Sequence, residues 1–467
     1  MTAKTCIHPL FTNSLVFIFI ITLLPCFLHA QGLKNTAFYE TSTGTLGISV
    51  GAGGVSVGVG VGVGVGIGSA PAPEAPNYPP PPEPEPLIFE NERLAVVYPV
   101  IHRFKKSITS DPHGITNTWV GPRICNYTGF YCDHPPDDNS LRALAGIDFN
   151  GYQLGAPTLD DFVDQLPDIA IFHANTNNFA GAISPKIAQL RYLYELDLSN
   201  NKFSGQFPMA VLGMDGLSFL DIRFNSFTGT VPAQIFTQPL DVLFINNNNF
   251  MQTLPANLGS TPVRYLTIAN NRFVGPIPRS IGNASATLVE VLLLNNQLSG
   301  CLPYEIGLLR SATVFDAGNN LLTGPIPCSF GCLEKMELLN LAGNQLYGQI
   351  PEAVCALRNL VNLSLSDNYF TSVGPTCRNL IKNGVLNVNN NCIHGLPNQR
   401  SVGECSAFHP GSCPYPPSYS FSFIPCELPQ SPPPRSIHSS KPSTTTAAFV
   451  SSHRSPPLPQ SLKNKLN

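Results

Sequence analysis

The sequence predicts an α/β leucine-rich-repeat solenoid, a horseshoe of about 11 repeats of 23–25 residues. Two observations predict this fold. The pattern L-x-x-L-x-L-x-x-N-x-F/L-x-G-x-I/L-P recurs between Ala143 and Pro397, most clearly in Leu193–Pro208, Val263–Pro278 and Met336–Pro351. Its copies also follow one another at a nearly constant spacing, and a fixed period of roughly 20–29 residues with this pattern is typical of such solenoids. A solenoid of this kind usually serves as a binding surface.

Each part of the repeat has an expected structural role. The L-x-x-L-x-L segment supplies a short parallel strand whose leucines point into the core. Glycine then permits a tight bend and proline ends strand pairing. The asparagine should turn inward and satisfy buried backbone groups. This position is occupied by Tyr152 in the first, degenerate copy and then by Asn177, Asn201, Asn225, Asn248, Asn271, Asn296, Asn320, Asn344, Asn368 and Asn391.

The beginning of the chain predicts secretion. Residues 1–30 have the features of a signal peptide, with the apolar run Leu15–Leu24 and a small residue, Ala30, at the expected cleavage site. Cys6 and Cys26 would leave with it, so 11 of the 13 cysteines remain, and most should be paired in an oxidising compartment. We expect no later membrane span. Sequons predict glycosylation at Asn126, Asn283 and Asn362.

The predicted domains follow the composition. A Gly-Val and Pro-rich arm covers 31–86, an N-terminal cap 87–139, the repeats 140–397, a C-terminal cysteine cap 398–426 and a disordered Pro/Ser-rich tail 427–467. In the N-terminal cap we expect an amphipathic helix that is broken at Pro99, together with a Cys125–Cys132 disulfide. Between the later repeats we expect disulfides among neighbouring turns, with Cys332–Cys355 as the preferred pair because the two cysteines occupy nearly the same repeat position.

The candidate binding site is the concave strand face. Four residues before each asparagine lies an outward-facing column that contains four aspartates and no lysine or arginine, although Arg223 lies nearby on the same face. Six residues before it, the middle repeats carry Glu195, Phe219, Val242, Tyr265 and Glu290. An acidic surface beside aromatic side chains suits a cationic peptide with apolar anchors. The predicted ligand-binding residues are Asp197, Asp221, Phe219, Phe244, Tyr265 and Asp316, and a glycan on Asn362 would restrict contact to the N-terminal and middle repeats.

Several function classes are disfavoured. The catalytic motif H-E-x-x-H does not occur, and G-x-S-x-G occurs as Gly47–Gly51 and Gly54–Gly58 within the low-complexity Gly-Val arm, where no nucleophile elbow is expected. Cys328-x3-Cys332 has no second half of a zinc site. We therefore expect no enzyme activity, no metal and no cofactor. A net charge of −3 does not suggest a nucleic-acid partner.

Three segments carry a resemblance to a known family. They are Thr118–Gly121 with Cys125 and Gly129–Cys132, then Gly300–Leu309, and the cap Asn391–Arg400 with Glu404–Cys405 and Cys413. Together they span about 90–413, and in them the chain resembles the leucine-rich repeat extensins of plant cell walls. The resemblance implies an apoplastic protein that binds basic, cysteine-rich signalling peptides (the rapid alkalinization factors), contacts cell-wall polymers and forms a disulfide-linked homodimer. Here the extensin module is reduced to Ser431–Pro434, and the Val-Gly arm is an addition.

We thus expect a secreted cell-wall protein that binds a basic cysteine-rich signalling peptide on its concave face and links wall state to growth control. Two alternatives stay open. One is a structural wall glycoprotein, in which Tyr78, Tyr415 and Tyr419 would be crosslinking sites and which would resist salt extraction. The other is an inhibitor of a wall-degrading glycosidase that uses the same face, although the acidic column and the Pro-rich flanks argue against it.

Overall fold

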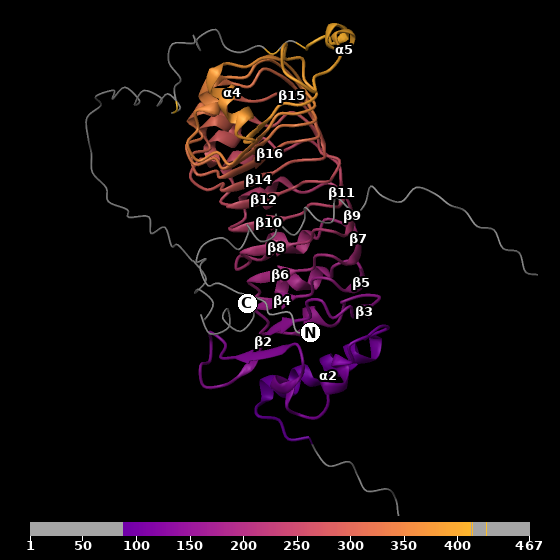
Figure 1. Cartoon of the computed structure of the whole chain (residues 1–467). Coiled ribbons are helices and arrows are strands. Elements are labelled where there is room, and N and C mark those ends of the chain that lie inside the picture. Colours follow the sequence, from indigo (N-terminus) through magenta and orange to yellow (C-terminus); the bar gives the residue numbers. More distant parts are fainter. Residues whose placement is uncertain (1–86, 412, 414–425, 427–467) are drawn as a thin grey trace, which may run out of the picture. The chain divides into compact units, whose positions relative to one another are not determined.

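The computed structural model describes residues 87–411, 413 and 426, which all belong to one compact unit, Glu83–Asn467. The predicted signal peptide, the Gly-Val and Pro-rich arm, the tyrosines proposed for crosslinking and the tail lie outside the described residues. The unit is a stack of coils (Figure 1), and each coil contributes one strand to a long sheet of twelve strands. Eleven of these strands run parallel, from β2 to β22, so the predicted solenoid of about 11 repeats is confirmed.

The strands form one long sheet and two shorter ones. The long sheet contains β1 Phe130–Asp133, β2 Ala143–Asp148, β4 Ile171–His173, β6 Glu195–Asp197, β8 Phe219–Asp221, β10 Val242–Phe244, β12 Tyr265–Thr267, β14 Glu290–Leu292, β16 Val314–Asp316, β18 Leu338–Asn340, β20 Asn362–Ser364 and β22 Leu386–Asn387. The side sheets contain β3 Gly155–Ala156, β5 Asn178–Gly181, β7 Lys202–Gln206, β9 Ser226–Gly229 and β11 Asn249–Phe250, then β13 Val274–Gly275, β15 Gln297–Cys301, β17 Leu321–Gly324, β19 Gln345–Gln349 and β21 Tyr369–Ser372.

Short helices connect the sheets and close the two ends. The 3-10 helices are η1 Ile115–Thr118, η2 Ile124–Asn126, η3 Val163–Gln165, η4 Pro185–Gln189, η5 Met209–Gly213, η6 Ala233–Thr237, η7 Leu258–Ser260, η8 Arg279–Ala284, η9 Tyr304–Leu308 and η10 Cys328–Cys332. The α-helices are α2 Glu92–Ser107, α3 Glu352–Cys355, α4 Pro375–Lys382 and α5 Val402–Ala407. In Figure 1, α2 lies at one end of the stack, while α4 and α5 lie at the other.

The repeat asparagines form a buried ladder that joins successive coils. In a typical rung, the Asn296 side-chain amide donates hydrogen bonds to the carbonyls of Ile268, Leu293 and Leu294 at 3.1–3.2 Å. Its oxygen accepts the backbone N–H of Phe273 at 2.9 Å. One side chain thus satisfies three acceptors and one donor that the tight turn leaves unpaired. The inward-turned asparagine that the sequence predicts is therefore present in the described repeats, from Asn177 to Asn391.

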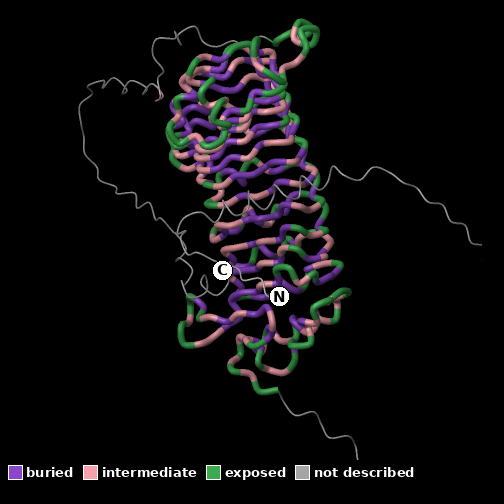
Figure 2. Tube along the Cα trace, viewed as in Figure 1, coloured by how far each residue is buried: buried purple, intermediate pink, exposed green. Residues whose placement is uncertain are grey.

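The apolar interior is continuous along the stack (Figure 2). The second residue after each ladder asparagine is an aromatic or aliphatic side chain that is fully or nearly fully buried. It is phenylalanine in five consecutive coils, Phe179, Phe203, Phe227, Phe250 and Phe273. Four of these residues lie in the side-sheet strands β5, β7, β9 and β11, and all five belong to the continuous core.

The side sheets are separated at the coil that contains Asn248. Most coils place a glycine four residues after the ladder asparagine, for example Gly229 and Gly275, but this coil has Gln252 there. The Gln252 side chain accepts the N–H of Val231 at 2.9 Å and donates to its carbonyl at 2.8 Å. These two bonds join the coil to the preceding one. Toward the next coil the contact is an isolated bridge between Thr253 and Val274, and β11 and β13 belong to different sheets.

The N-terminal cap corrects one prediction. We expected a helix broken at Pro99, but α2 runs from Glu92 to Ser107 without interruption. Pro99 lies on the exposed side of the helix, whereas Leu94, Val97 and Ile101 on the opposite side are buried. Burying such an apolar face outweighs the cost of about 3 kcal/mol that proline imposes on a helix interior. Next to this helix, Cys125 and Cys132 form a disulfide, and Trp119 is fully buried.

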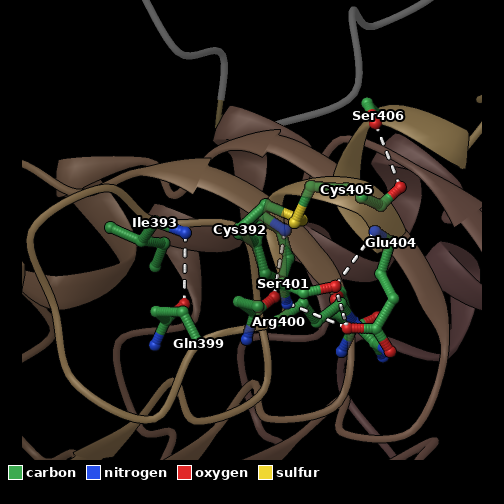
Figure 3. Close-up of a disulfide and its surroundings, with 12 residues drawn as sticks. Cys392, Ile393, Gln399, Arg400, Ser401, Glu404, Cys405 and Ser406 are labelled. Carbon is green, nitrogen blue, oxygen red and sulfur yellow. Dashed lines mark hydrogen bonds between the residues drawn. A yellow bond between two sulfur atoms is a disulfide. The ribbon is translucent and has the colours of Figure 1, made fainter.

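The C-terminal cap is built around the Cys392–Cys405 disulfide (Figure 3). The Gln399 side chain accepts the N–H of Ile393 at 3.1 Å and so holds the turn that precedes α5. Ser401 and Glu404 then form a reciprocal capping box at the start of that helix. The cap is therefore stabilised by local hydrogen bonds as well as by its disulfide.

Beyond α5, the chain turns back along the side of the stack. The ring of Phe408 stacks on Tyr369 with 3.7 Å between ring centroids, and the carbonyl of Gly411 accepts the hydroxyl of Tyr347 at 2.8 Å. Cys413 then bonds to Cys301 in β15. We call residues 408–411 and 413 the strap, because their contacts extend from β21 back to β15.

The remaining disulfides differ from the expected pair. The predicted Cys332–Cys355 disulfide is wrong, because Cys332 pairs with Cys426 and Cys355 pairs with Cys377 of the next coil. Similar positions in successive repeats do not decide the pairing, since Cys426, from outside the repeats, lies within bonding distance of Cys332. Among the described cysteines, only Cys328 has no disulfide partner.

Candidate functional site: the exposed face of the long sheet

The candidate site is the solvent-facing side of the long sheet, which we call the strand face. In each three-residue strand, the central side chain is buried in the core, as Leu196, Leu220 and Val291 are. The first and third side chains therefore point to the strand face. These two columns contain the acidic and aromatic residues that the sequence analysis selected.

The aspartate column has a structural role that the sequence analysis missed. The Asp197 carboxylate accepts the backbone N–H of Ser199 at 2.9 Å, and the Asp316 carboxylate accepts that of Gly318 at the same distance. Asn340 and Asn387 make the same bond in their own coils. Asp and Asn favour this bond to the N–H two residues ahead, which caps the end of the strand. This structural role could have been predicted from the sequence, because the column contains both Asp and Asn, and both side chains supply an oxygen that accepts this hydrogen bond.

One predicted binding residue, Asp221, is not accessible. We expected it to face a ligand, but it is 0% exposed. Its carboxylate lies 2.9 Å from the Arg223 guanidinium, which in turn lies over the Phe244 ring at 5.1 Å. Burial, followed by the nearby Asp197 carboxylate, raises the pKa of Asp221 well above its ordinary value, against the opposing effect of Arg223. Asp221 therefore offers no free negative charge to a ligand.

A second ion pair lies one strand nearer the N-terminal cap. The His173 imidazole is 3.0 Å from the Glu195 carboxylate. Burial alone would lower the pKa of His173, but the hydrogen bond to Glu195 and the charges of Asp197, Glu195 and Asp148 outweigh it, so the pKa is raised. The pair retains excess negative charge around it, because Asp148 and Asp197 make no ion pair within the described part of the chain.

The middle of the strand face is an apolar stripe. The Phe219 and Phe244 rings lie 6.2 Å apart and edge to face, while Tyr265 follows on the next strand, and all three predicted side chains are half-buried. The structure therefore brings Phe219, Phe244 and Tyr265 together. The apolar stripe consists of Phe219, Val242, Phe244, Tyr265, Leu292, Val314 and Leu338.

Asp316 lies on the C-terminal side of the three aromatic residues. Its second oxygen accepts the Asn340 amide at 3.0 Å. Burial raises the pKa of Asp316, and its bonds to Gly318 and Asn340 oppose that effect. Asp197 and Asp316 thus lie on either side of the aromatic residues, both half-buried and both already holding backbone groups.

Glu290 is the site residue that the sequence analysis named in a column but did not select. It begins β14, is 7% exposed and lies between Tyr265 and Val314 in register. Burial, followed by the neighbouring Glu337 carboxyl, raises its pKa from 4.5 to about 7. The available signal was an acidic residue flanked by apolar residues in both adjacent repeats, with no basic residue at the matching positions.

We expect Glu290→Gln to stabilise the protein at alkaline pH. Because the pKa of this carboxyl is raised by folding, the folded state carries no penalty below about pH 4.5, an increasing penalty as the pH rises, and the full penalty above about pH 7. The variant should gain about 2–3 kcal/mol in the free energy of unfolding near pH 8 and nothing near pH 4. Chemical denaturation at the two pH values measures this, with the exposed Glu334→Gln as control. An equal effect at both pH values would contradict the prediction.

The three sequon asparagines are exposed. Asn126 lies in η2, Asn283 lies in η8, and Asn362 is the first residue of β20. Asn362 therefore lies on the strand face itself, not at its edge, so that a glycan there would cover the C-terminal repeats. Within 87–411, no helix is long and apolar enough to cross a membrane.

The fold and its disulfides define a disulfide-capped leucine-rich-repeat protein of the kind found outside the cell. Residues 192–214 match the Leucine Rich Repeat family. The leucine-rich repeat extensin-like protein 7 of Arabidopsis thaliana is 52% identical over 322 residues, which are 69% of this chain and 73% of that protein. The chain belongs to the plant leucine-rich repeat extensin-like family.

A second relative matches over a smaller part of its own length, and two solved structures are also similar. The leucine-rich repeat extensin-like protein 4 of Arabidopsis thaliana is 50% identical over 160 residues, which are 34% of this chain and only 32% of that protein. A solved plant ice-binding protein is 20% identical, with a TM-score of 0.53 over 65% of this chain and 95% of that one, a likeness in fold. The plant peptide hormone receptor RGFR1, solved in complex with RGF2, is 27% identical, with a TM-score of 0.46 over 49% of this chain and 38% of that one.

Proposed function

We propose that this protein is secreted into the plant cell wall and there binds a basic, cysteine-rich signalling peptide on its strand face, so that wall state is linked to growth control. The observation that carries this proposal is the charge of the two outward columns. They hold five carboxyl residues besides the buried Asp221, and neither column contains a lysine or arginine. The five are Asp148, Glu195, Asp197, Glu290 and Asp316, whereas Asp221 is buried beside Arg223.

The apolar stripe supplies the second part of the argument. Half-buried aromatic side chains at the centre of a polar surface are the usual anchors of a protein interface. Phe219, Phe244 and Tyr265 occupy that position, with acidic residues on both sides. A folded peptide with an apolar patch inside a basic rim is complementary to this arrangement.

The wall location and the assembly follow from other features. Five disulfides within the described part of the chain fit an oxidising compartment. The family name extensin-like fits contact with cell-wall polymers. Cys328, half-buried in η10 and without a disulfide, is the candidate for the bond of a disulfide-linked homodimer.

We expect the variant Phe244→Ala with Tyr265→Ala to lose most of its affinity for such a peptide. Truncating central anchors typically weakens binding by roughly 30-fold or more. Calorimetric titration of the protein with a panel of oxidised, basic cysteine-rich peptides measures this. The matched control is Leu321→Ala with Met251→Ala, which removes exposed apolar side chains outside the strand columns.

Two outcomes would count against the proposed function. If the control variant loses as much affinity as the strand-face variant, the peptide does not bind at the stripe. If no peptide of the panel binds the unmodified protein, peptide recognition fails and a structural role in the wall becomes the better interpretation. Enhanced binding at low salt is expected in the successful case, because the columns contribute by charge.

A further inference from the structure

Glu290 lies within the apolar stripe. Its strand neighbours in register are Tyr265 on β12 and Val314 on β16. The next residue, Val291, is fully buried in the core, so the Glu290 side chain points to the strand face. Although it faces outward, the residue is 93% covered by its neighbours, as its 7% exposure shows.

The Glu290 carboxyl has no partner among residues 87–411, 413 and 426. It makes no hydrogen bond and no ion pair there. The other carboxyls of the strand face are different: Glu195 pairs with His173, Asp221 lies beside Arg223, and Asp316 holds Asn340. Buried carboxyls are normally paired, because an uncompensated charge in such surroundings is costly. Glu290 is therefore an exception that the stability of the fold does not explain.

The charged groups near Glu290 do not neutralise it. Glu337, which precedes β18, acts on it with the same sign of charge. Arg264, which precedes β12, is directed over the ring of Tyr265, with 5.7 Å between the guanidinium carbon and the ring centroid. From β16, Asp316 already bonds to Asn340 and Gly318. The site therefore combines the carboxyls of Glu290 and Glu337 with aromatic and aliphatic neighbours, and no cation of the described residues forms an ion pair with Glu290.

The chemistry of these walls selects one kind of cation. A metal ion such as Ca²⁺ requires about six to eight oxygen ligands, and the described residues contain no group of three metal-binding side chains. A lysine or arginine side chain fits better, since its methylene groups can lie on the half-buried Tyr265 ring while its charged end reaches the carboxyl. An arginine can bind a carboxylate through two hydrogen bonds and so gains the most.

We propose that Glu290 is the specificity-determining residue of the strand face, which receives one lysine or arginine side chain of the ligand between Tyr265 and Val314. This inference rests on the proposed function for the identity of the ligand, a basic peptide. Beyond the general charge complementarity of the columns, it requires one basic residue at a particular position of the ligand. It also gives a use to a carboxyl that destabilises the unliganded protein.

The test uses two short peptides that differ only in charge, acetyl-Phe-Arg-Phe-amide and its neutral near-isostere acetyl-Phe-citrulline-Phe-amide. NMR titration with the full chain should show roughly tenfold tighter binding of the arginine peptide near pH 8. The preference should weaken near pH 5, where Glu290 is mostly protonated. It should disappear in Glu290→Gln and persist in the exposed-residue control Glu334→Gln. Since Glu290→Gln is expected to gain stability, its loss of preference would not reflect unfolding.

An unchanged preference in Glu290→Gln, or equal or undetectable binding of the two peptides to the unmodified protein, would overturn this inference. The result is independent of the titration with cysteine-rich peptides. If those peptides bind and the arginine preference is absent, the inference fails and the proposed function stands. If the arginine preference is present and no cysteine-rich peptide binds, Glu290 does recognise an arginine side chain, but the proposed class of ligand is wrong.

Discussion

Replacing both Cys301 and Cys413 with serine should lower the free energy of unfolding by about 4–5 kcal/mol. This disulfide joins cysteines that are 112 residues apart. In the chain-entropy description, a crosslink that closes a loop of about 100 residues removes the equivalent of about 4.7 kcal/mol from the unfolded state. Both cysteines are replaced together, so that no new free thiol is created. Guanidinium denaturation followed by circular dichroism measures the loss.

The Cys125–Cys132 disulfide provides the matched control. Its cysteines are 7 residues apart, so its removal by two serine substitutions should cost about 2 kcal/mol in the same description. The test is whether removal of the Cys301–Cys413 disulfide lowers the free energy of unfolding more than removal of Cys125–Cys132. A larger loss from the short loop would mean that local packing around Trp119, and not loop closure, determines what the disulfides contribute.

Asn296→Ala should destabilise the protein by about 3–5 kcal/mol. The substitution leaves the carbonyls of Ile268, Leu293 and Leu294 and the N–H of Phe273 without their partner. An orphaned buried polar group costs about 1–3 kcal/mol, and the total falls short of the sum because the coil can relax. Thermal unfolding measures the effect, and hydrogen exchange should show the largest loss of protection in the coils that contain β14 and β12.

Asn389, an exposed asparagine two residues before the ladder residue Asn391, serves as the comparison. The Asn389 side chain is exposed and makes no hydrogen bond within the described residues. Asn389→Ala should therefore change stability by less than about 0.5 kcal/mol. If the two variants behaved alike, the ladder would not be a main source of stability.

Features determined within one repeat could be predicted from the sequence. The asparagine ladder, the inward leucines and the outward positions of Phe219, Phe244 and Tyr265 all follow from a fixed position in a repeated pattern. The position of a residue within the repeat was sufficient here, because each coil pairs its backbone groups with the same hydrogen bonds.

Features determined between distant segments could not be predicted. The pairing of Cys332 with Cys426 depends on a strap that returns along the side of the stack. The continuity of α2 through Pro99 depends on the surface that the helix covers. In the sequence, Asp221 has the same repeat position as Asp197 and Asp316, but in the structure it forms a buried ion pair with Arg223. In each case the deciding partner is not part of the repeat pattern.

The position of Cys426 has a mechanical consequence. The chain beyond this residue is attached covalently to Cys332 in η10, many residues before the C-terminal cap. A pulling force applied to residues 427–467 would therefore enter the solenoid at η10. The last coils, α4 and the cap around Cys392–Cys405 would carry little of that load. Under such a force, the Cys332–Cys426 disulfide would keep the C-terminal end of the stack folded.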